Sequence, residues 1–345
     1  MLRIRDLRNA LRESQRALRE IRHEVGDIRH EVGELRREAS ELPGLRQELA
    51  DLREQNTALS AKLDQHEAIH RDMHHQRVMT SQGFVDHLQA ATDRTVAAVR
   101  AAAEDPVRAR RDLAALRAGE AYAAAYTDAD PLVSILIPTY DNHAGLRERS
   151  IPSALGQTHE HVEVIVVGDV SPTATAEVIG GFDDARLRFE NLTQRGPYPD
   201  REPDFWFTAG TYPLNRAFAL ASGQWIAVLN DDDAYRPDCI AKLLELARTT
   251  NAEVAYGRSR YHHPDEAQSW DHGTFPPELH HFGWQQALQH AGLRCFEFEL
   301  FAPAFGEPGD WNRARRMLEA GVRFSMTDEI VADYWPSKLW KDAAA

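Results

Sequence analysis

Three adjacent aspartates, Asp231, Asp232 and Asp233, follow a run of buried-type strand residues at 225–229. Neighbouring carboxylates repel one another and have poor strand propensity, so a chain that places them at a strand end needs a positive charge there. Hard oxygen ligands in a short acidic run suit Mg²⁺ or Mn²⁺, which keep some waters and take further ligands from substrate phosphates. The alternative is a solvated acidic turn before the helix that begins near Pro237.

Alternating strands and helices are predicted to carry these aspartates to one edge of a sheet. The pattern indicates strands at 132–138, 162–168, 187–190 and 225–229, with helices ending near 157 and at 174–179, 213–222 and 237–249. Such alternation is typical of an α/β fold with a largely parallel sheet covered on both faces. Ligands of these sheets bind at the carboxyl ends of the strands. Tyr140, Asp141 and Asp169 also follow strand ends, so acids distant in sequence are expected to converge.

Composition excludes several classes of function. The 345 residues carry a formal net charge of -14, which argues against a general binder of nucleic acid or of acidic membranes. Two cysteines, Cys239 and Cys295, form neither a disulfide framework nor a metal-binding spacing, which fits a reducing cytoplasm. The sequence has no run of 18 or more apolar residues and no apolar signal core at its start. We therefore expect a cytoplasmic protein without stable membrane insertion.

Residues 1–76 are predicted to form a parallel coiled coil and to make the protein a homodimer. Segments 21–27 and 28–34 are a near-exact heptad duplication, and their register places glutamates at g and arginines at e, as in a parallel helix pair. The seam residues, spaced alternately by about three and four, include Ile4, Leu7, Leu11, Leu18, Ile21, Val25, Ile28, Val32 and Leu35. The alternative is one long amphipathic helix folded back on the globular part.

Two further boundaries follow from the sequence. Pro43 and Gly44 interrupt the heptad register, and the seam resumes with Asn56 at a position where a buried Asn commonly fixes register. Residues 77–128 are rich in Ala and Arg and are predicted to be a helical linker, with breaks at Gly83 and Pro106. The globular domain is predicted to span 129–340. Its segment 193–211 has no regular period and is interpreted as a long irregular loop.

The motifs of the globular domain resemble those of glycosyltransferase family 2. They occur in the expected order at 131–142, 157–158, 162–169, 215–217, 221–233 and 309–311. The resemblance covers roughly 131–340 and implies the GT-A nucleotide-diphospho-sugar transferase fold, a mostly parallel twisted sheet flanked by helices, here preceded by the coiled coil. It implies an inverting, metal-dependent transfer of a sugar from a nucleotide-diphosphate donor to a hydroxyl acceptor, which is a glycan, a lipid-linked molecule or a protein.

The resemblance also assigns the donor side of the site. Cofactor-binding residues would be Pro138, Thr139 and Tyr140 as the wall of the base pocket, Asp169 on the base, Asp231 near the ribose, and Asn215 on the preceding helix. Asp232 takes the position of the metal-binding aspartate, and Asp233 is its neighbour on a metal-bound water. Arg216 is interpreted either as a phosphate contact or as a solvated surface arginine. Asp271 and His272 fall where this family shapes the donor and acceptor pockets.

On the acceptor side, Asp310 matches the catalytic acid of the family and begins a helix that runs to about residue 320. Inverting transfer needs one carboxylate that takes the proton of the attacking hydroxyl while the sugar is displaced from the opposite face. Two alternatives remain open from the residues alone. Asp310 is an ordinary N-cap, or Glu307 is the base and Asp310 is structural.

Three departures from the family pattern support a different function. Gly168 and Asn230 stand where the family has acids, and the tail 331–337 lacks the late histidine that often binds the metal. They suit a catalytically decayed domain that serves as a coiled-coil scaffold. A nucleotidyltransferase is a third possibility, but that chemistry usually has a Gly-rich phosphate loop after the first strand. The residues after Ile137 are Pro-Thr-Tyr-Asp-Asn instead.

Overall fold

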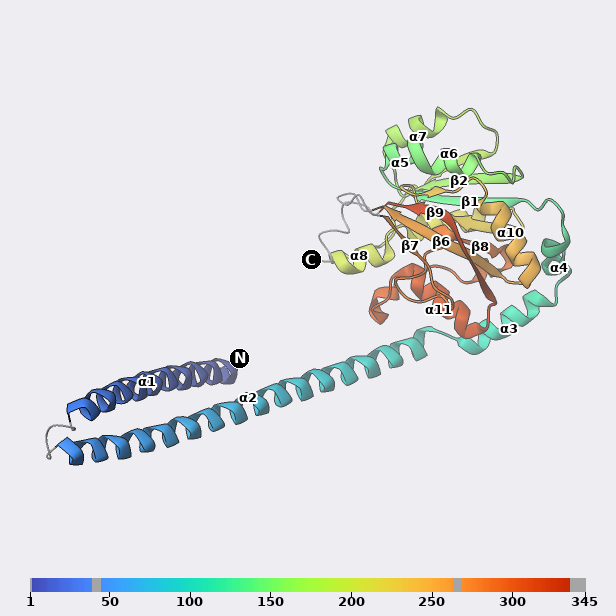
Figure 1. Ribbon diagram of the computed structural model, residues 1–345. Coiled ribbons are helices and arrows are strands. Elements are labelled where there is room, and N and C mark those ends of the chain that lie inside the picture. Colours follow the sequence, from blue (N-terminus) through green and yellow to red (C-terminus); the bar gives the residue numbers. More distant parts are fainter. Residues whose placement is uncertain (1, 39–44, 263–268, 336–345) are drawn as a thin grey trace. The chain divides into compact units, whose positions relative to one another are not determined.

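The computed structural model describes residues 2–38, 45–262 and 269–335. They fall into two compact units, which divide between Thr95 and Val96. The first unit holds long helices, and the second holds the sheet and the helices around it (Figure 1). Each unit is described by itself below.

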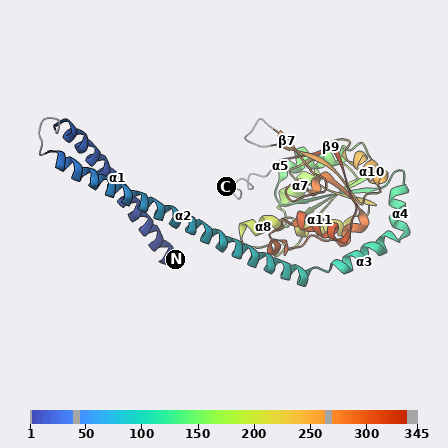
Figure 2. The same ribbon diagram turned by 60° about the horizontal axis from the view of Figure 1, so that its bottom comes forward.

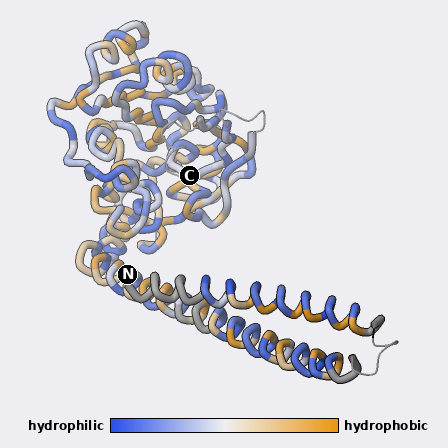
Figure 3. Tube along the Cα trace, turned by 90° about the vertical axis from the view of Figure 1, so that its left-hand side faces the viewer, coloured by the Kyte–Doolittle hydropathy of each residue, from blue (hydrophilic) through white to orange (hydrophobic). Residues whose placement is uncertain are grey.

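The first unit is a pair of helices, α1 (Leu2–Glu38) and the first part of α2 (Leu45–Ala103). α1 runs back along α2 in the opposite direction (Figure 1), and Arg22 Nη2 lies 2.8 Å from Glu67 Oε1. Val25 and Leu49 are buried, and Figure 3 shows apolar residues recurring along both helices between hydrophilic ones. Within one chain, the apolar seam of α1 therefore has a helix to face. The predicted break at 43–44 lies outside the described residues, and the parallel homodimer stays a prediction.

The predicted break at Gly83 is wrong, whereas the break at Pro106 is confirmed. α2 continues through Gly83, because a glycine weakens a helix interior without ending it. Pro106 begins α3 (Pro106–Arg117), where its missing N–H costs nothing, and Asp105 Oδ1 caps the helix by accepting from the Arg108 N–H at 2.8 Å. A short helix, α4 (Glu120–Thr127), leads to the sheet.

One half of the sheet is parallel, as the alternation of strands and helices predicts. It contains β1 (Val133–Thr139), β2 (Val162–Gly168), β3 (Leu187–Asn191) and β4 (Trp225–Val228) in the order β3-β2-β1-β4. These strands match the four predicted ones closely. Because all four run in the same direction, their carboxyl ends lie along one edge, where the aspartates follow.

The other half of the sheet is mixed and was not predicted from the sequence. It adds β8 (Ala287–His290), β6 (Val254–His262), β9 (Phe324–Tyr334) and β5 (Ala234–Tyr235) beyond β4, and β7 (Ser269–His272) pairs with β6. β4 and β8 are antiparallel, as are β8 and β6, whereas β6 and β9 are parallel. The long β9 therefore carries its carboxyl end back toward the edge that holds the aspartates, because its residues 332 and 333 pair with β5.

Helices cover both faces of the sheet (Figures 1 and 2). One face packs against α5 (His143–Gly145), the π-helical turn η1 (Leu146–Ser150), α6 (Ile151–Leu155), α7 (Thr173–Gly180) and α10 (Cys239–Thr250). The opposite face packs against α9 (Thr211–Leu220), α11 (Gly309–Ala320) and α3. Side chains alternate along β1 accordingly: Ile135 and Ile137 enter the first core, and Leu136 enters the second.

The segment 193–211 is more regular than predicted. It contains α8 (Glu202–Thr208), whose aromatic residues pack with their neighbours: the rings of Phe205 and Trp206 lie 5.0 Å apart. A short 3₁₀ turn, η2 (Trp284–Gln286), leads into β8, and two more, η3 (Ala291–Cys295) and η4 (Ala302–Phe305), connect β8 to α11. Across the described ranges, no helix has both the length and the apolarity needed to cross a membrane.

The last part of the linker belongs to the globular unit. Glu253 is fully buried, and it accepts hydrogen bonds from Arg117 Nε and Nη2, each at 2.7 Å, and from Tyr122 Oη at 2.8 Å. Burial alone would raise the pKa of Glu253, but these donors, Arg117 first, hold it below the usual value. A carboxylate inside the sheet domain thus depends on residues that precede the predicted boundary at 129.

Replacing Arg117 by Ala should destabilise the protein by about 3 kcal/mol, because the buried Glu253 loses its two-pronged partner and keeps only the longer ion pair with Arg323, at 3.6 Å, among the described cations. The measurement is urea unfolding of the full chain. Arg111, whose contacts are on the exposed surface of α3, is the matched control, and Arg111→Ala should change stability by less than about 0.5 kcal/mol. Equal effects of the two substitutions would contradict this account.

Candidate active site

Asp231 links the ends of two neighbouring strands. Thr139 Oγ1 at the end of β1 donates to Asp231 Oδ2 at 2.6 Å, and Asn142 Nδ2 donates to Asp231 Oδ1 at 3.2 Å. Burial raises the pKa of Asp231, although these donors oppose the shift. The structure therefore brings together Thr139 and Asp231, which the sequence assigns to the base and the ribose. Their contact follows from the parallel pairing of β1 with β4.

Asp233 is fully buried and both of its oxygens have donors. Asn230 Nδ2 lies 2.8 Å from Asp233 Oδ2, and the backbone N–H of Trp335 lies 2.9 Å from Asp233 Oδ1. Burial, and then the charge of Asp232, raise its pKa well above the usual value. The presence of Asn at position 230 thus has a structural explanation. An acid here would add a further carboxylate, whereas the amide donates a hydrogen bond to Asp233.

Asp232 is the aspartate of the three that stays open to a ligand. It is half-buried, and within the described part of the chain no other side chain donates a hydrogen bond to its carboxylate. Burial and then the charge of Asp231 raise its pKa to about 6, which a nearby cation would reverse. The charge of Arg149 acts in the opposite direction to these two causes.

The donor set fits a cation that is shared with a substrate better than a cation held by protein alone. In the described ranges, no group of three or more His, Cys, Asp or Glu side chains is arranged to hold a metal. Mg²⁺ and similar ions are commonly bound by one or two carboxylates together with substrate phosphates. Asp232 offers such a carboxylate. Asp233 is its neighbour in the chain, and the oxygens of Asp233 already accept two hydrogen bonds.

Asp169 forms a second acidic position at the end of β2. It is 4% exposed, its Oδ2 lies 3.5 Å from Arg195 Nε, and its Oδ1 is buried without a hydrogen-bond partner. The guanidinium of Arg195 lies 4.3 Å from the ring centre of Tyr140, which is 41% exposed. An unpaired buried oxygen calls for a donor, so this place suits a ligand N–H. The sequence did not point to Arg195, because it follows β3 without a motif.

Gly168 departs from the family pattern for a steric reason. A Cβ at this position would lie 2.5 Å from Asn191 Oδ1 and 2.6 Å from Ser171 Oγ. Those two side chains fill the space: Asn191 Oδ1 accepts from the Ser171 N–H at 2.8 Å. The acid that the family has here is therefore replaced by a hydrogen-bonded turn, and Asp169 is the carboxylate that remains.

Asp310 lies in the first turn of α11, after Pro308 as N-cap. Its Oδ1 accepts from the Trp311 N–H at 2.7 Å, and its backbone carbonyl accepts from Trp284 Nε1 at 3.0 Å. Burial raises its pKa, and the charge of His280 is among the effects that oppose the shift. A carboxylate that resists ionisation in this way binds a proton more strongly than an exposed aspartate does.

Glu307, the alternative base, is committed to other contacts. It is 5% exposed, it accepts from Arg315 Nε at 2.9 and 3.1 Å and from Asn312 Nδ2 at 3.0 Å, and Arg100 pairs with its Oε1. Both of its oxygens already accept hydrogen bonds, so neither is free to accept the proton of a substrate hydroxyl. The geometry therefore favours Asp310 over Glu307 as the base.

Tyr334, near the end of β9, relates the two halves of the site. Burial raises its pKa first, and the charges of Asp233, Asp232 and Asp310 raise it further. The charges of carboxylates from both halves of the site thus act on this phenol. Tyr334 also packs against Tyr261, with ring centres 5.2 Å apart, and Tyr261 stacks on Trp270 at 4.2 Å.

Other predicted residues have mainly structural contacts. Asn215 exchanges two hydrogen bonds with the backbone of Phe298, at 2.8 and 3.0 Å. Arg216 pairs with Glu190 on the surface, with Nε 2.6 Å from Oε1, which is the second of its two interpretations. Asp271 pairs with Arg260 at 3.0 Å. Pro138 ends the apolar part of β1 and is half-buried.

A histidine that the sequence did not single out lies beside the tail. His262 Nε2, on β6, is 2.6 Å from Asp333 Oδ1, and its ring stacks on Trp335 with centres 4.5 Å apart. Trp335 is the residue whose backbone N–H binds Asp233. The tail 331–337 itself contains no histidine.

Comparison with known proteins points to one family of enzymes. Residues 212–302 match the glycosyl transferase family 2 profile. The succinoglycan biosynthesis protein ExoO of Rhizobium meliloti (strain 1021) is 36% identical over 129 residues, which are 37% of this chain and 33% of that protein. The putative teichuronic acid biosynthesis glycosyltransferase TuaG of Bacillus subtilis (strain 168) is 29% identical over 121 residues, 34% of this chain and 43% of that protein. The chain thus spans less than half the length of these relatives.

Among solved structures, S. aureus TarS 1–349 in complex with UDP-GlcNAc aligns with a TM-score of 0.48 and 14% identity, over 60% of this chain and 59% of that one. The mannosyltransferase PcManGT from Pyrobaculum calidifontis, in complex with GDP-Man and Mn²⁺, gives a TM-score of 0.45 and 15% identity, over 67% and 69%. The profile match and the curated relatives show that the second unit contains a glycosyltransferase family 2 segment, at residues 212–302.

Asn215→Ala tests whether this residue is structural. It removes both partners of the Phe298 backbone groups and should destabilise the protein by about 1–3 kcal/mol in urea unfolding. Affinity for a nucleotide sugar, measured by calorimetry, should stay within about two-fold, a change of less than about 0.5 kcal/mol. Arg216→Gln on the same helix is the control, with little effect on stability. A large loss of affinity without a loss of stability would instead place Asn215 in the donor pocket.

Proposed function

We propose that the protein is an inverting, metal-dependent glycosyltransferase that moves a sugar from a nucleotide-diphosphate donor to a hydroxyl acceptor. The single observation that carries this proposal is the acidic end of β4 in a segment that matches glycosyltransferase family 2: Asp231 and Asp233 accept hydrogen bonds from side chains, whereas Asp232, within the described residues, accepts none. Asp232 is open to a cation, and Asp310 is a proton acceptor with a raised pKa. We further infer a cytoplasmic location from the cysteine content.

On the donor side, the chain supplies groups for the nucleotide. Asp169 presents an unpaired, buried Oδ1 that would accept from a base N–H, and the exposed ring of Tyr140 offers a stacking surface. Asp231, already held by Thr139 and Asn142, would place the adjacent Asp232 toward the diphosphate. Asp232 would hold Mg²⁺ or Mn²⁺, which when bound neutralises charge on the leaving nucleoside diphosphate.

On the acceptor side, Asp310 would accept the proton of the attacking hydroxyl. The burial that raises its pKa also gives it more basicity than an exposed aspartate, which favours proton transfer near neutral pH. One base suffices for inversion, because the hydroxyl displaces the nucleoside diphosphate directly. The new bond joins the acceptor oxygen to the anomeric carbon, the bond to the diphosphate oxygen breaks, and the proton passes to Asp310.

Isothermal calorimetry and donor turnover separate the roles of the two aspartates. Wild type should bind one of UDP-glucose, UDP-N-acetylglucosamine, dTDP-glucose or GDP-mannose with heat that depends on Mn²⁺. Asp232→Asn should abolish the metal-dependent part of that heat, because one open carboxylate is lost. Asp310→Asn should bind the donor normally but lower its turnover by about 10²- to 10⁴-fold, since only the base is removed.

Asp328→Asn is the control, because Asp328 is exposed and pairs only with Arg258 at the surface. It should resemble wild type in both measurements. If wild type itself gives no metal-dependent heat with any of these donors, the scaffold hypothesis is the better one. If Asp310→Asn turns over donor at the wild-type rate, Asp310 is not the base.

We also propose a homodimer formed through residues 1–76. The narrow apolar seam and the g-to-e charge pattern support it. Several large apolar side chains of the first unit are exposed, among them Ile69, Val78, Met79, Phe84, Val85 and Leu88. Light scattering on the full chain should give twice the mass of one chain. The mass of a single chain would mean that the pairing of α1 with α2 satisfies the seam internally.

A further inference from the structure

Two linker residues at the end of α2 reach the helix that carries Asp310. Arg100 lies in the last turn of α2, and Glu104 follows the helix. Their spacing of four and the bond from the Glu104 N–H to the Arg100 carbonyl, at 2.8 Å, place them on the same side of the helix end. Both belong to the globular unit. Neither forms part of any motif that resembles the transferase family.

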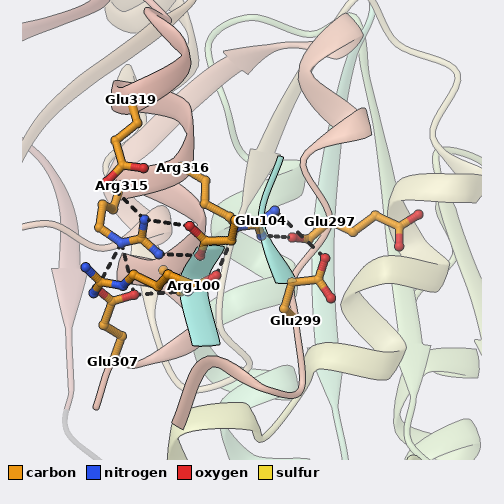
Figure 4. Close-up of polar contacts among 9 residues, drawn as sticks. Arg100, Glu104, Glu297, Glu299, Glu307, Arg315, Arg316 and Glu319 are labelled. Atoms are coloured by element: carbon orange, nitrogen blue, oxygen red, sulfur yellow. Dashed lines mark hydrogen bonds and ion pairs between the residues drawn. The ribbon is translucent and has the colours of Figure 1, made fainter. Parts of the chain in front are cut away.

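Glu104 and Arg315 form a forked ion pair (Figure 4). Arg315 Nη2 lies 2.6 Å from Glu104 Oε1, and Arg315 Nη1 lies 3.1 Å from Glu104 Oε2. Both side chains are 11% exposed, so water screens this pair little. Burial alone would lower the pKa of Arg315, but its hydrogen bonds to Glu104 and Glu307 raise it. The pair ties the end of α2 to the middle of α11.

Arg100 makes the second connection. It pairs with Glu307 Oε1, and its guanidinium lies 5.5 Å from the ring centre of Phe305. Arg315 Nε binds the same carboxylate at 2.9 Å, so Glu307 lies between one arginine of the linker and one of α11 (Figure 4). Asn312 Nδ2 donates to Glu307 Oε2 at 3.0 Å. We call Arg100, Glu104, Glu307 and Arg315 the linker clasp.

Asp310 lies between the points that the linker clasp holds. Glu307 is three residues before it, and Arg315 is five residues after it. The sequence from 306 to 309 is Gly-Glu-Pro-Gly, and Gly306 has a left-handed φ of 68°. A turn with two glycines has few side-chain contacts of its own to fix it. Besides its backbone hydrogen bonds and the bond from Trp284 Nε1 to the Asp310 carbonyl, the groups that bind Glu307 hold it in place.

We propose that Arg100 and Glu104 are positioning residues that act through Glu307 and Arg315 to hold Asp310 at the reaction centre. This inference rests on the proposed function for its catalytic consequence, but its structural content does not. It assigns the final turn of the linker to the active site, although that turn precedes the transferase motifs by some thirty residues. Glu307, the buried carboxylate that was the alternative to Asp310 as the base, thus becomes one of the residues that hold Asp310 in place.

Hydrogen–deuterium exchange on the full chain tests the structural content. Glu104→Gln keeps the size of the side chain and removes its charge, and Arg100→Gln replaces the guanidinium by a shorter, uncharged polar group. Each should raise exchange of peptides that cover 306–312 by about ten-fold, because local opening there is no longer opposed by the ion pairs. Arg100→Lys, which keeps the charge, should stay close to wild type. Arg111→Gln, on the exposed surface of α3, is the matched control and should leave exchange unchanged.

Turnover of the same variants tests the positioning role. With Mn²⁺ and whichever of UDP-glucose, UDP-N-acetylglucosamine and GDP-mannose the wild type consumes, kcat should fall about 10- to 100-fold and KM should stay within about two-fold. Arg100→Lys should restore most of kcat. A purely structural role would lower the amount of active protein and leave the kcat of the folded fraction unchanged.

Unchanged exchange at 306–312 in both charge-removing variants would overturn the proposal. Faster exchange with wild-type kcat would overturn the positioning role, because Asp310 would then act without the linker clasp. If the wild type consumes none of these donors with Mn²⁺, the proposed function loses support, and the exchange experiment still decides whether the linker holds this segment.

Discussion

Three consecutive carboxylates at the end of β4 impose the constraint on which the site depends. They cannot all be buried and charged without partners, and the fold answers each one differently. Asp231 accepts hydrogen bonds from Thr139, the last residue of β1, and from Asn142, just after that strand. Asp233 receives an amide and a backbone N–H. Asp232, between them, keeps its carboxylate free for a ligand. The hydrogen bonds of Asp231 and Asp233 therefore fix the direction of the Asp232 side chain.

The hydrogen bonds of Asp233 depend on the mixed half of the sheet. The backbone N–H that binds Asp233 belongs to Trp335, one residue beyond β9, and β9 is aligned by its pairing with β5 and β6. The ring of Trp335 lies between the imidazole of His262 and the guanidinium of Arg149, at 4.5 and 4.9 Å. The strands after residue 250 thus cover the acidic end of β4, and the same end of β9 places Tyr334 against Tyr261.

The sequence predicted the parallel half and the residue types of the site, because both have strong local signals. A run such as 162–168 has a strand period, and acids that follow parallel strands must share an edge. The resemblance assigned the metal to Asp232, but the sequence did not predict the hydrogen bonds that Asp233 accepts, since one of their donors, Trp335, is far from it in the chain. Arg195 and His262 have no motif and act through contacts with Asp169 and Asp333. Such residues can be identified only from the tertiary contacts that they make.

The composition of the sequence changes near residue 129, but the folded domain does not begin there. Motifs and strand periods begin there, so a sequence pattern places the domain start at that point. The physical domain begins earlier, because Glu253 and Glu307 are buried carboxylates whose cations, Arg117 and Arg100, lie in the linker. A buried charge without its partner costs far more than an exposed one, so the chain segment that supplies the partner is part of the fold. The arginines of this Ala-rich linker are thus of two kinds. Some are solvated, and others complete the electrostatics of the enzyme core.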